Sequence, residues 1–235
     1  MKTASAHQFN FLIFDLDDTL LDTYGQLVPQ ASREACEAMI SSGLNATIAQ
    51  CLATREEIAQ TEKRIDLFEN MTAALGVRTG VDPYSVALSG FKAFYDRKVE
   101  KNISLFPGAR ETLKSLKETY SLHLVTAGHH GTQSEKLKIL QLEPLFNSVT
   151  IVDTFAGQTK SKAFHDIQSK TGARPEAHLS IGNRLDTDIA PAKALNWSTC
   201  WVKYGEYARS KAANALERPD FTIESIQELV PVCRL

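Results

Sequence analysis

The sequence predicts an α/β fold in which a doubly wound parallel sheet is interrupted by an inserted helical segment. Three observations lead to this prediction. A short apolar run near the N-terminus ends at a cluster of acidic residues. A long stretch with helical spacing follows, and beyond it strand-like and helix-like segments alternate. Such alternation is typical of sheets whose parallel strands are joined by helices.

A first strand is predicted over residues 9–14, where the run FNFLIF is mostly apolar. A short run of this kind indicates a strand that is buried on both faces of a sheet. It leads into the acidic turn DLDDT at residues 15–19. Open α/β sheets place their chemistry at the carboxyl ends of their strands, so this turn is the first candidate for a functional site.

Helical spacing dominates from about residue 23 to residue 103. The clearest helical patterns cover residues 31–43, 47–76 and 83–100. One strand precedes this region and the other strands follow it. We therefore predict one α/β core domain, residues 1–22 and 104–235, interrupted by a helical cap domain, residues 23–103.

The remainder of the chain alternates between the two kinds of segment. Helices are predicted over residues 109–120, 133–142, 162–172 and 189–196. Strands are predicted over residues 121–128, 148–153, 178–183 and 198–204.

Composition excludes several classes of protein. The chain has 43% hydrophobic and 23% charged residues and a formal net charge of -2, so it lacks the basic excess that favours nucleic acid as a partner. No run approaches the roughly 18 apolar residues that span a bilayer, and the N-terminus lacks the apolar stretch of a signal peptide. We expect a cytoplasmic protein that binds neither nucleic acid nor membrane.

The acidic turn brings two carboxyl groups, Asp15 and Asp17, close together after a strand. Two carboxylates separated by one residue can point into one cleft, where one attacks an electrophile and the other transfers protons. The alternative is that these residues only form a turn or cap the next helix.

Two later segments offer groups that bind anions. The run LHLVTAG brings a hydroxyl group, that of Thr126, to the end of a predicted strand, where it can hold phosphoryl oxygens. The segment QTKSKAF offers Lys160 or Lys162 as a cation. Each has an ordinary alternative, a plain turn for the threonine and a solvated side chain for the lysines.

A third segment, LSIGNRLDTDI, offers oxygen ligands for a metal. Asn183, Asp186 and Asp188 follow a buried strand, and their amide and carboxylate oxygens suit a hard cation such as Mg²⁺. The alternative is a capped helix start.

Taken together and in this order, the four segments resemble the four motifs of the haloacid dehalogenase-like (HAD-like) superfamily, over about residues 10–204. The first motif of that family is DxDx[T/V], which DLDDT matches fully. The resemblance implies a Rossmann-like core with a helical cap, and a hydrolase of the phosphatase branch. Its partner would be a small phosphorylated metabolite.

The resemblance also implies a role for each site residue. Asp15 would be the nucleophile that is transiently phosphorylated, and Asp17 would be its acid/base partner. Thr126 and Lys160 would bind the transferring phosphoryl group. Lys160 is preferred over Lys162 because its distance to the following aromatic residue better suits the spacing in the family.

Magnesium is the cofactor that the resemblance implies. Its ligands would be the Asp15 carboxylate, the Asp17 backbone carbonyl, Asn183 and Asp188. The last motif of the family commonly reads GDxxxxD, whereas this chain has Asn183 in place of the first acid. The amide carbonyl can still coordinate, and either Asp186 or Asp188 supplies the missing charge.

The predicted function is Mg²⁺-dependent cleavage of a small phosphomonoester. One alternative is a phosphomutase of the same superfamily, and another is a weakened catalyst, marked by Asn183, that serves as a binding or regulatory protein. A dehalogenase is disfavoured because such enzymes lack the second aspartate, which is present here as Asp17. Neither the individual substrate nor the oligomeric state can be inferred from the sequence.

Overall fold

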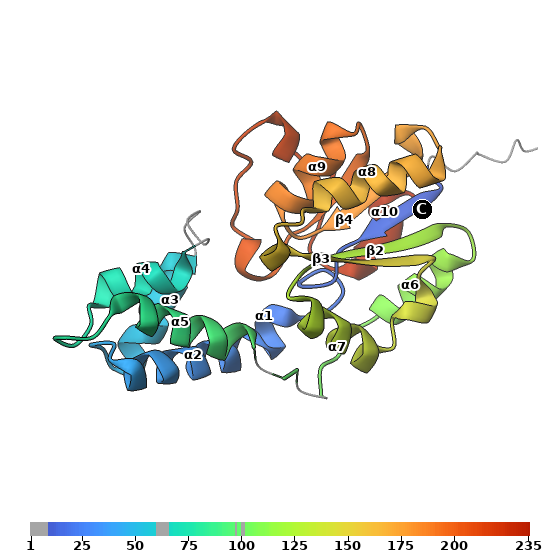
Figure 1. Cartoon of the computed structure of the whole chain (residues 1–235). Coiled ribbons are helices and arrows are strands. Elements are labelled where there is room, and N and C mark those ends of the chain that lie inside the picture. The colour runs from blue at the N-terminus through green and yellow to red at the C-terminus, as the bar shows by residue number, and fades with distance from the viewer. Residues whose placement is uncertain (1–8, 60–65, 97, 100–101) are drawn as a thin grey trace, which may run out of the picture. The chain divides into compact units, whose positions relative to one another are not determined.

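Six parallel strands form the central sheet, in the order β3-β2-β1-β4-β5-β6 (Figure 1). The computed structural model describes residues 9–59, 66–96, 98–99 and 102–235. This sheet, with helices on both faces, confirms the predicted α/β fold. The strands are β1 (Phe11–Phe14), β2 (Ser121–Gly128), β3 (Ser148–Asp153), β4 (His178–Gly182), β5 (Ser198–Val202) and β6 (Phe221–Ile223).

Strand β1 lies between β2 and β4, where the strand order changes direction. Phe14 is in register with Leu124 of β2 and with Ile181 of β4. The segments that follow these three positions therefore meet at one edge of the sheet. In open α/β folds this switch point is where ligands bind.

Helices cover the two faces of the sheet, with α8 and α9 on one side and α6 and α7 on the other (Figure 1). The α helices of this unit are α6 (Ala109–Lys117), α7 (His130–Leu140), α8 (Lys160–Thr171), α9 (Ala190–Ala194) and α10 (Leu229–Cys233). On the α8 side, apolar side chains from the strands and helices form one buried cluster. Its members include Ile13, Val125, Val152, Phe164 and Trp197.

Short helical turns connect the main elements. The 3-10 turns are η1 (Glu143–Leu145), η2 (Thr154–Ala156), η3 (Pro175–Ala177), η5 (Gly205–Tyr207), η6 (Ala215–Glu217) and η7 (Ile226–Glu228). A π-helical turn, η4 (Leu185–Ile189), leads directly into α9.

The chain divides into two units, one of Met1–Thr23 with Lys101–Leu235 and the other of Tyr24–Glu100. The second unit has its own buried core, which includes Met39, Phe68 and Met71. Its described residues form helices joined by loops, and the turn α1 spans the boundary. The helices are α1 (Thr23–Gln26), α2 (Val28–Ser42), α3 (Ile48–Ala59), α4 (Leu67–Leu75) and α5 (Pro83–Tyr95).

Several predicted boundaries differ from the structure. Helix α7 begins at residue 130 and α8 at residue 160, three and two residues before the predicted starts. Strand β6 and helix α10 were not predicted. Of the predicted helical segments, residues 60–65, 97 and 100 lie outside the described residues, as do residues 1–8 and 101. Within the described part of the chain, no helix is long and apolar enough to cross a membrane.

Candidate active site

The turn after β1 is built by its own backbone. The amides of Leu20 and Leu21 both donate to the carbonyl of Leu16, and the amide of Asp18 donates to the carbonyl of Leu21 at 2.7 Å. This folding requires a left-handed backbone at Asp18, with a φ of 55°. Gly205 has a φ of 69°, and a Cβ on it would be 2.4 Å from the Asp18 carboxylate, so both its backbone and its surroundings favour glycine.

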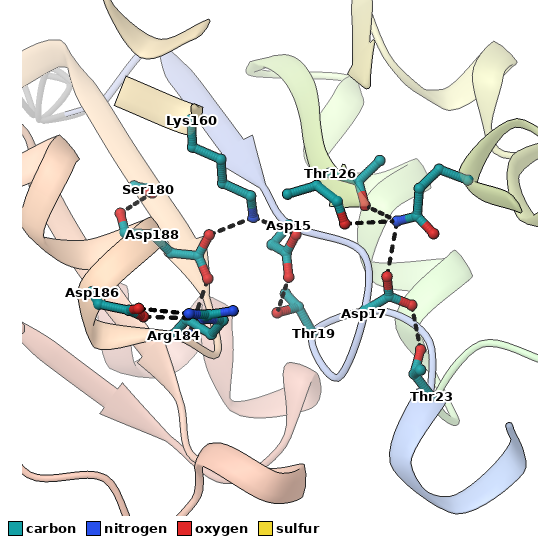
Figure 2. Close-up of polar contacts among 12 residues, drawn as sticks. Asp15, Asp17, Thr19, Thr23, Thr126, Lys160, Ser180, Arg184, Asp186 and Asp188 are labelled. Atoms are coloured by element: carbon teal, nitrogen blue, oxygen red, sulfur yellow. Dashed lines mark hydrogen bonds and ion pairs between the residues drawn. The ribbon is translucent and has the colours of Figure 1, made fainter. Parts of the chain in front are cut away.

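Asp15, at the start of this turn, shares one lysine with Asp188 (Figure 2). The Lys160 Nζ lies 2.5 Å from an oxygen of Asp15 and 2.5 Å from an oxygen of Asp188. All three residues are buried, with exposed fractions of 7% for Asp15, 6% for Lys160 and 1% for Asp188. The segments that follow β1, β3 and β4 thus converge, with Asp15 and Asp188 on either side of one ammonium group.

Charge around Asp15 is only partly balanced by this lysine. Burial, which Lys160 opposes and the carboxylates of Asp188 and Asp17 reinforce, raises the pKa of Asp15 to about 7. Burial would lower the pKa of Lys160, but the two carboxylates outweigh burial and raise it. The lysine is therefore charged, while Asp15 exchanges its proton near neutral pH.

The path of the chain after β4 brings Asp188 to the lysine. A Cβ on Gly182 would lie 2.4 Å from the carboxylate carbon of Asp188, so only glycine leaves room for that side chain. The backbone amide of Arg184 donates to Asp188 Oδ2 at 2.9 Å, and the Ser180 hydroxyl donates to the Asp188 carbonyl at 3.1 Å. Asp188 is thus fixed through both its backbone and its side chain.

Asp17 has a different set of partners. Lys136 Nζ lies 2.6 Å from Asp17 Oδ1, which also accepts a hydrogen bond from the Thr23 hydroxyl. The Gln133 amide donates to Asp17 Oδ2 at 2.8 Å and also donates to the Thr126 hydroxyl. Burial would raise the pKa of Asp17, but Lys136 and the hydrogen bonds from Lys136, Thr23 and Gln133 outweigh burial and lower it.

Sequence reasoning missed Gln133 and Lys136, both of which contact Asp17. They lie three residues apart on α7, the helix that follows the strand carrying Thr126. Residues with this spacing share one face of a helix. A polar pair on the helix directly after a motif strand is the signal that could have found them.

The two lysines of the QTKSKAF segment lie in different environments. Lys160 is the first residue of α8 and contacts Asp15, whereas Lys162 is exposed and pairs with Asp166 at 3.2 Å. Thr126 is fully buried and lies two residues before the end of β2 rather than at it.

The three oxygen donors after β4 lie in different environments. Asp188 contacts Lys160, whereas Asp186 is exposed and its carboxylate accepts two hydrogen bonds from the Arg184 guanidinium, at 3.0 and 2.5 Å. Asn183 is buried, and its backbone carbonyl accepts a hydrogen bond from Trp201 Nε1 at 2.8 Å. Within the described ranges, no three His, Cys, Asp or Glu residues form a group that could hold a metal ion.

Comparison with known proteins identifies the family. The sequence profile described as haloacid dehalogenase-like hydrolase matches residues 12–202. The chain belongs to this family. Membership confirms the resemblance found in the sequence and the prediction that the protein is an enzyme, a HAD-like hydrolase.

Relatives of the chain in the same family include two archaeal proteins named glyceraldehyde 3-phosphate phosphatase. The protein of Methanocaldococcus jannaschii is 31% identical over 95% of this chain and 96% of its own length. That of Pyrococcus furiosus is 33% identical over 94% and 91%. In fold, the chain resembles YfnB of Bacillus subtilis, described as a HAD-hydrolase bound to magnesium, with a TM-score of 0.69 and 20% identity over 97% of this chain and 100% of that one.

Proposed function

We propose that this HAD-like hydrolase is a magnesium-dependent phosphatase that cleaves a small phosphomonoester through an aspartyl phosphate on Asp15. The observation that carries the proposal is the buried contact between Asp15 and Lys160 at the switch point of the sheet. A carboxylate beside a buried ammonium can attack an anionic ester, because the cation offsets the repulsion between the two anions.

In the first step, a carboxylate oxygen of Asp15 attacks phosphorus and the bond from phosphorus to the ester oxygen breaks. The leaving oxygen takes a proton from Asp17, which enters this step as the carboxylic acid because the negative charge of the bound phosphoester opposes the lowering of its pKa by Lys136. In the second step, Asp17 removes a proton from a water molecule, whose oxygen attacks phosphorus. The bond from phosphorus to Asp15 breaks, and inorganic phosphate and the free Asp15 carboxylate result.

Two further groups assist transfer of the phosphoryl group. The Thr126 hydroxyl and the Lys160 ammonium would bind its oxygens as charge builds up on them. Lys160 is already charged in the buried site, since the two carboxylates raise its pKa. Little reorganisation of the protein is then needed when the substrate binds.

The residues present fit magnesium. The proposed donors are oxygens, from the Asp15 and Asp188 carboxylates, the Asp17 backbone carbonyl and the Asn183 amide, and oxygen is what Mg²⁺ prefers. The charge also fits, because the surrounding carboxylates help to raise the pKa of Asp15 to about 7. Bound Mg²⁺ supplies positive charge that favours the ionised nucleophile and screens it from the anionic substrate.

For the substrate, we propose a small phosphorylated metabolite and take glyceraldehyde 3-phosphate as the first to test. This choice rests on the names of the relatives that are 31% and 33% identical. We assign the role of a cap to the helical domain, residues 23–103, and expect it to determine specificity. The identities of Asp15, Asp17 and Lys160 favour a working catalyst over a purely regulatory protein.

Turnover of para-nitrophenyl phosphate and of glyceraldehyde 3-phosphate, each with and without Mg²⁺, tests the proposal. We expect activity that requires Mg²⁺ and is abolished by Asp15→Asn. The exposed carboxylate of Asp166 provides a matched control, so Asp166→Asn is expected to retain activity. Wild-type protein no more active than Asp15→Asn would contradict the enzymatic function, and activity that survives Asp15→Asn would contradict the covalent mechanism.

A further inference from the structure

Helix α7 presents two polar side chains that lie outside the four motifs of the family. Gln133 and Lys136 are buried, with exposed fractions of 2% and 6%, and both contact Asp17. Burial of an ammonium group is costly unless the group is paired, so the position of Lys136 depends on the carboxylate that it contacts.

The two side chains bind different oxygens of Asp17. Lys136 contacts Oδ1 at 2.6 Å, and the Gln133 amide donates to Oδ2 at 2.8 Å. A carboxylate that is bound at both oxygens has one preferred orientation, because rotation would break one of the two contacts. The pair therefore fixes the direction in which Asp17 faces.

Gln133 also connects Asp17 to Thr126. Its amide group donates to the Thr126 hydroxyl oxygen and, at 3.4 Å, to the carbonyl of Ala127. Because the hydroxyl oxygen accepts this hydrogen bond, its own hydrogen remains available as a donor. The same glutamine thus orients the acid/base group and the hydroxyl that would face the phosphoryl oxygens.

We propose that Gln133 and Lys136 are positioning residues for the proton transfer between Asp17 and the leaving oxygen. This inference rests on the proposed phosphatase function and extends it to a second lysine. Lys160 serves the nucleophile, and Lys136, with Gln133, serves the acid/base residue. This arrangement assists the breaking of the bond from phosphorus to the ester oxygen, because that oxygen takes its proton from Asp17.

If Gln133 and Lys136 position Asp17, replacing either one slows the cleavage of alkyl and aryl esters to different extents. A purely structural role predicts no such difference. Para-nitrophenolate is a stable anion and leaves without a proton, whereas an alkoxide needs one as it departs. Loss of correct orientation at Asp17 must therefore slow the cleavage of alkyl esters far more than that of the aryl ester. Loss of fold or of phosphoryl binding slows both to a similar extent.

The experiment measures kcat/KM of Lys136→Met on para-nitrophenyl phosphate and on two alkyl esters, glyceraldehyde 3-phosphate and glycerol 3-phosphate. We expect the loss on the alkyl esters to exceed the loss on the aryl ester by roughly tenfold or more, because general acid catalysis typically contributes about 10²–10⁴-fold. Gln133→Leu is expected to show the same dependence on the ester without a change of charge. Lys136→Arg is expected to restore part of the activity.

Two controls isolate the effect. Lys138 is exposed on the same helix, so Lys138→Met makes the same chemical change there. It is expected to leave kcat/KM on the aryl ester and on both alkyl esters unchanged. In an Asp17→Asn background, adding Lys136→Met is expected to change the alkyl-ester rate by less than about twofold, because a residue that acts through Asp17 has nothing left to orient.

The outcomes distinguish this inference from the function on which it rests. Equal losses on aryl and alkyl esters, or a full effect of Lys136→Met in the Asp17→Asn background, overturn the inference but not the function. The inference is also overturned if the wild-type protein cleaves the aryl ester but neither alkyl ester. No wild-type activity on any ester contradicts the proposed function itself. If Lys136→Met does not fold, as judged by its thermal unfolding, Gln133→Leu decides the result.

Discussion

At the scale of single residues, the site holds more negative charge than its shared lysine balances. One ammonium group contacts both Asp15 and Asp188, while Asp17 adds a further negative charge nearby. Burial together with these carboxylates raises the pKa of Asp15 to about 7. The folded, metal-free protein therefore holds a proton on Asp15 that the unfolded chain releases at lower pH.

This proton makes the free energy of unfolding of the metal-free protein depend on pH. Between the ordinary pKa of an aspartate and about 7, the folded state binds more protons at Asp15 than the unfolded state, so this group destabilises the fold as pH rises. We expect Asp15→Asn to gain roughly 2 kcal/mol relative to wild type between pH 5 and pH 8. Urea unfolding in the presence of a chelator measures this difference.

The exposed Asp166 provides the control for this prediction. Asp166→Asn carries the same chemical change at the surface, and its stability relative to wild type is expected not to vary in this way with pH. A stability difference for Asp15→Asn that is constant from pH 5 to pH 8 would show that Asp15 ionises normally in the fold.

Binding of Mg²⁺ distinguishes the two carboxylates that follow Asn183. A ligand that binds only the folded state raises the thermal unfolding temperature. We expect Mg²⁺ to raise that of wild type and of Asp186→Asn, because the Asp186 carboxylate is exposed and paired with Arg184. The rise is expected to be largely lost in Asp188→Asn. The reverse pattern would assign the metal to Asp186.

Prediction from sequence at this scale worked best where a residue follows a strand. Asp15 follows β1 and Lys160 follows β3, and they meet because both strands pair in parallel with β2. Gln133 and Lys136 were missed because a glutamine and a lysine on a helix that covers a sheet usually face solvent. The packing of α7 against β2 and β3 turns these two side chains inward.

At the scale of elements, the last residue of β4, at position 182, must be a glycine to leave room for the side chain of Asp188. A Cβ at position 182 would lie 2.4 Å from the Asp188 carboxylate carbon. We expect Gly182→Ala to displace Asp188 from Lys160, to cost about 1–3 kcal/mol of stability and to reduce kcat. Urea unfolding and turnover of para-nitrophenyl phosphate measure the two effects.

Gly172, at the end of α8, provides the comparison for this variant. It has a φ of +60° but no atom within 4 Å of an added Cβ. Gly172→Ala is therefore expected to cost stability, by about 1 kcal/mol, without a change in kcat. If Gly182→Ala loses stability but keeps full activity, the position of Asp188 does not matter for catalysis.

Elements with a strong apolar pattern were predicted closely. Strands β2 and β3 cover the predicted residues 121–128 and 148–153. Strand β6 was missed because it has only three residues, too few for a period to be visible. The helix predicted over residues 189–196 is present as the shorter α9, and the π-helical turn η4 before it, which carries Asp188, was not predicted.

At the scale of the whole molecule, the site depends on the order of the strands. Segments far apart in sequence contribute Asp15, Thr126, Lys160 and Asp188, and the order β3-β2-β1-β4 brings their carrier strands together. The alternation of strands and helices predicted a parallel sheet, and a parallel sheet places all carboxyl ends at one edge. The division of roles between the core and the helical domain remains a proposal.

The most direct test of the account is detection of the phosphorylated intermediate. Asp17→Asn is expected to form the aspartyl phosphate from para-nitrophenyl phosphate and to hydrolyse it slowly, because no group then activates water. Acid quenching, borohydride reduction and mass spectrometry would convert and locate the modified residue. We predict homoserine at position 15, dependent on substrate and Mg²⁺ and lost in Asp15→Asn. Turnover with no modified residue, or with modification at another position, would contradict the account.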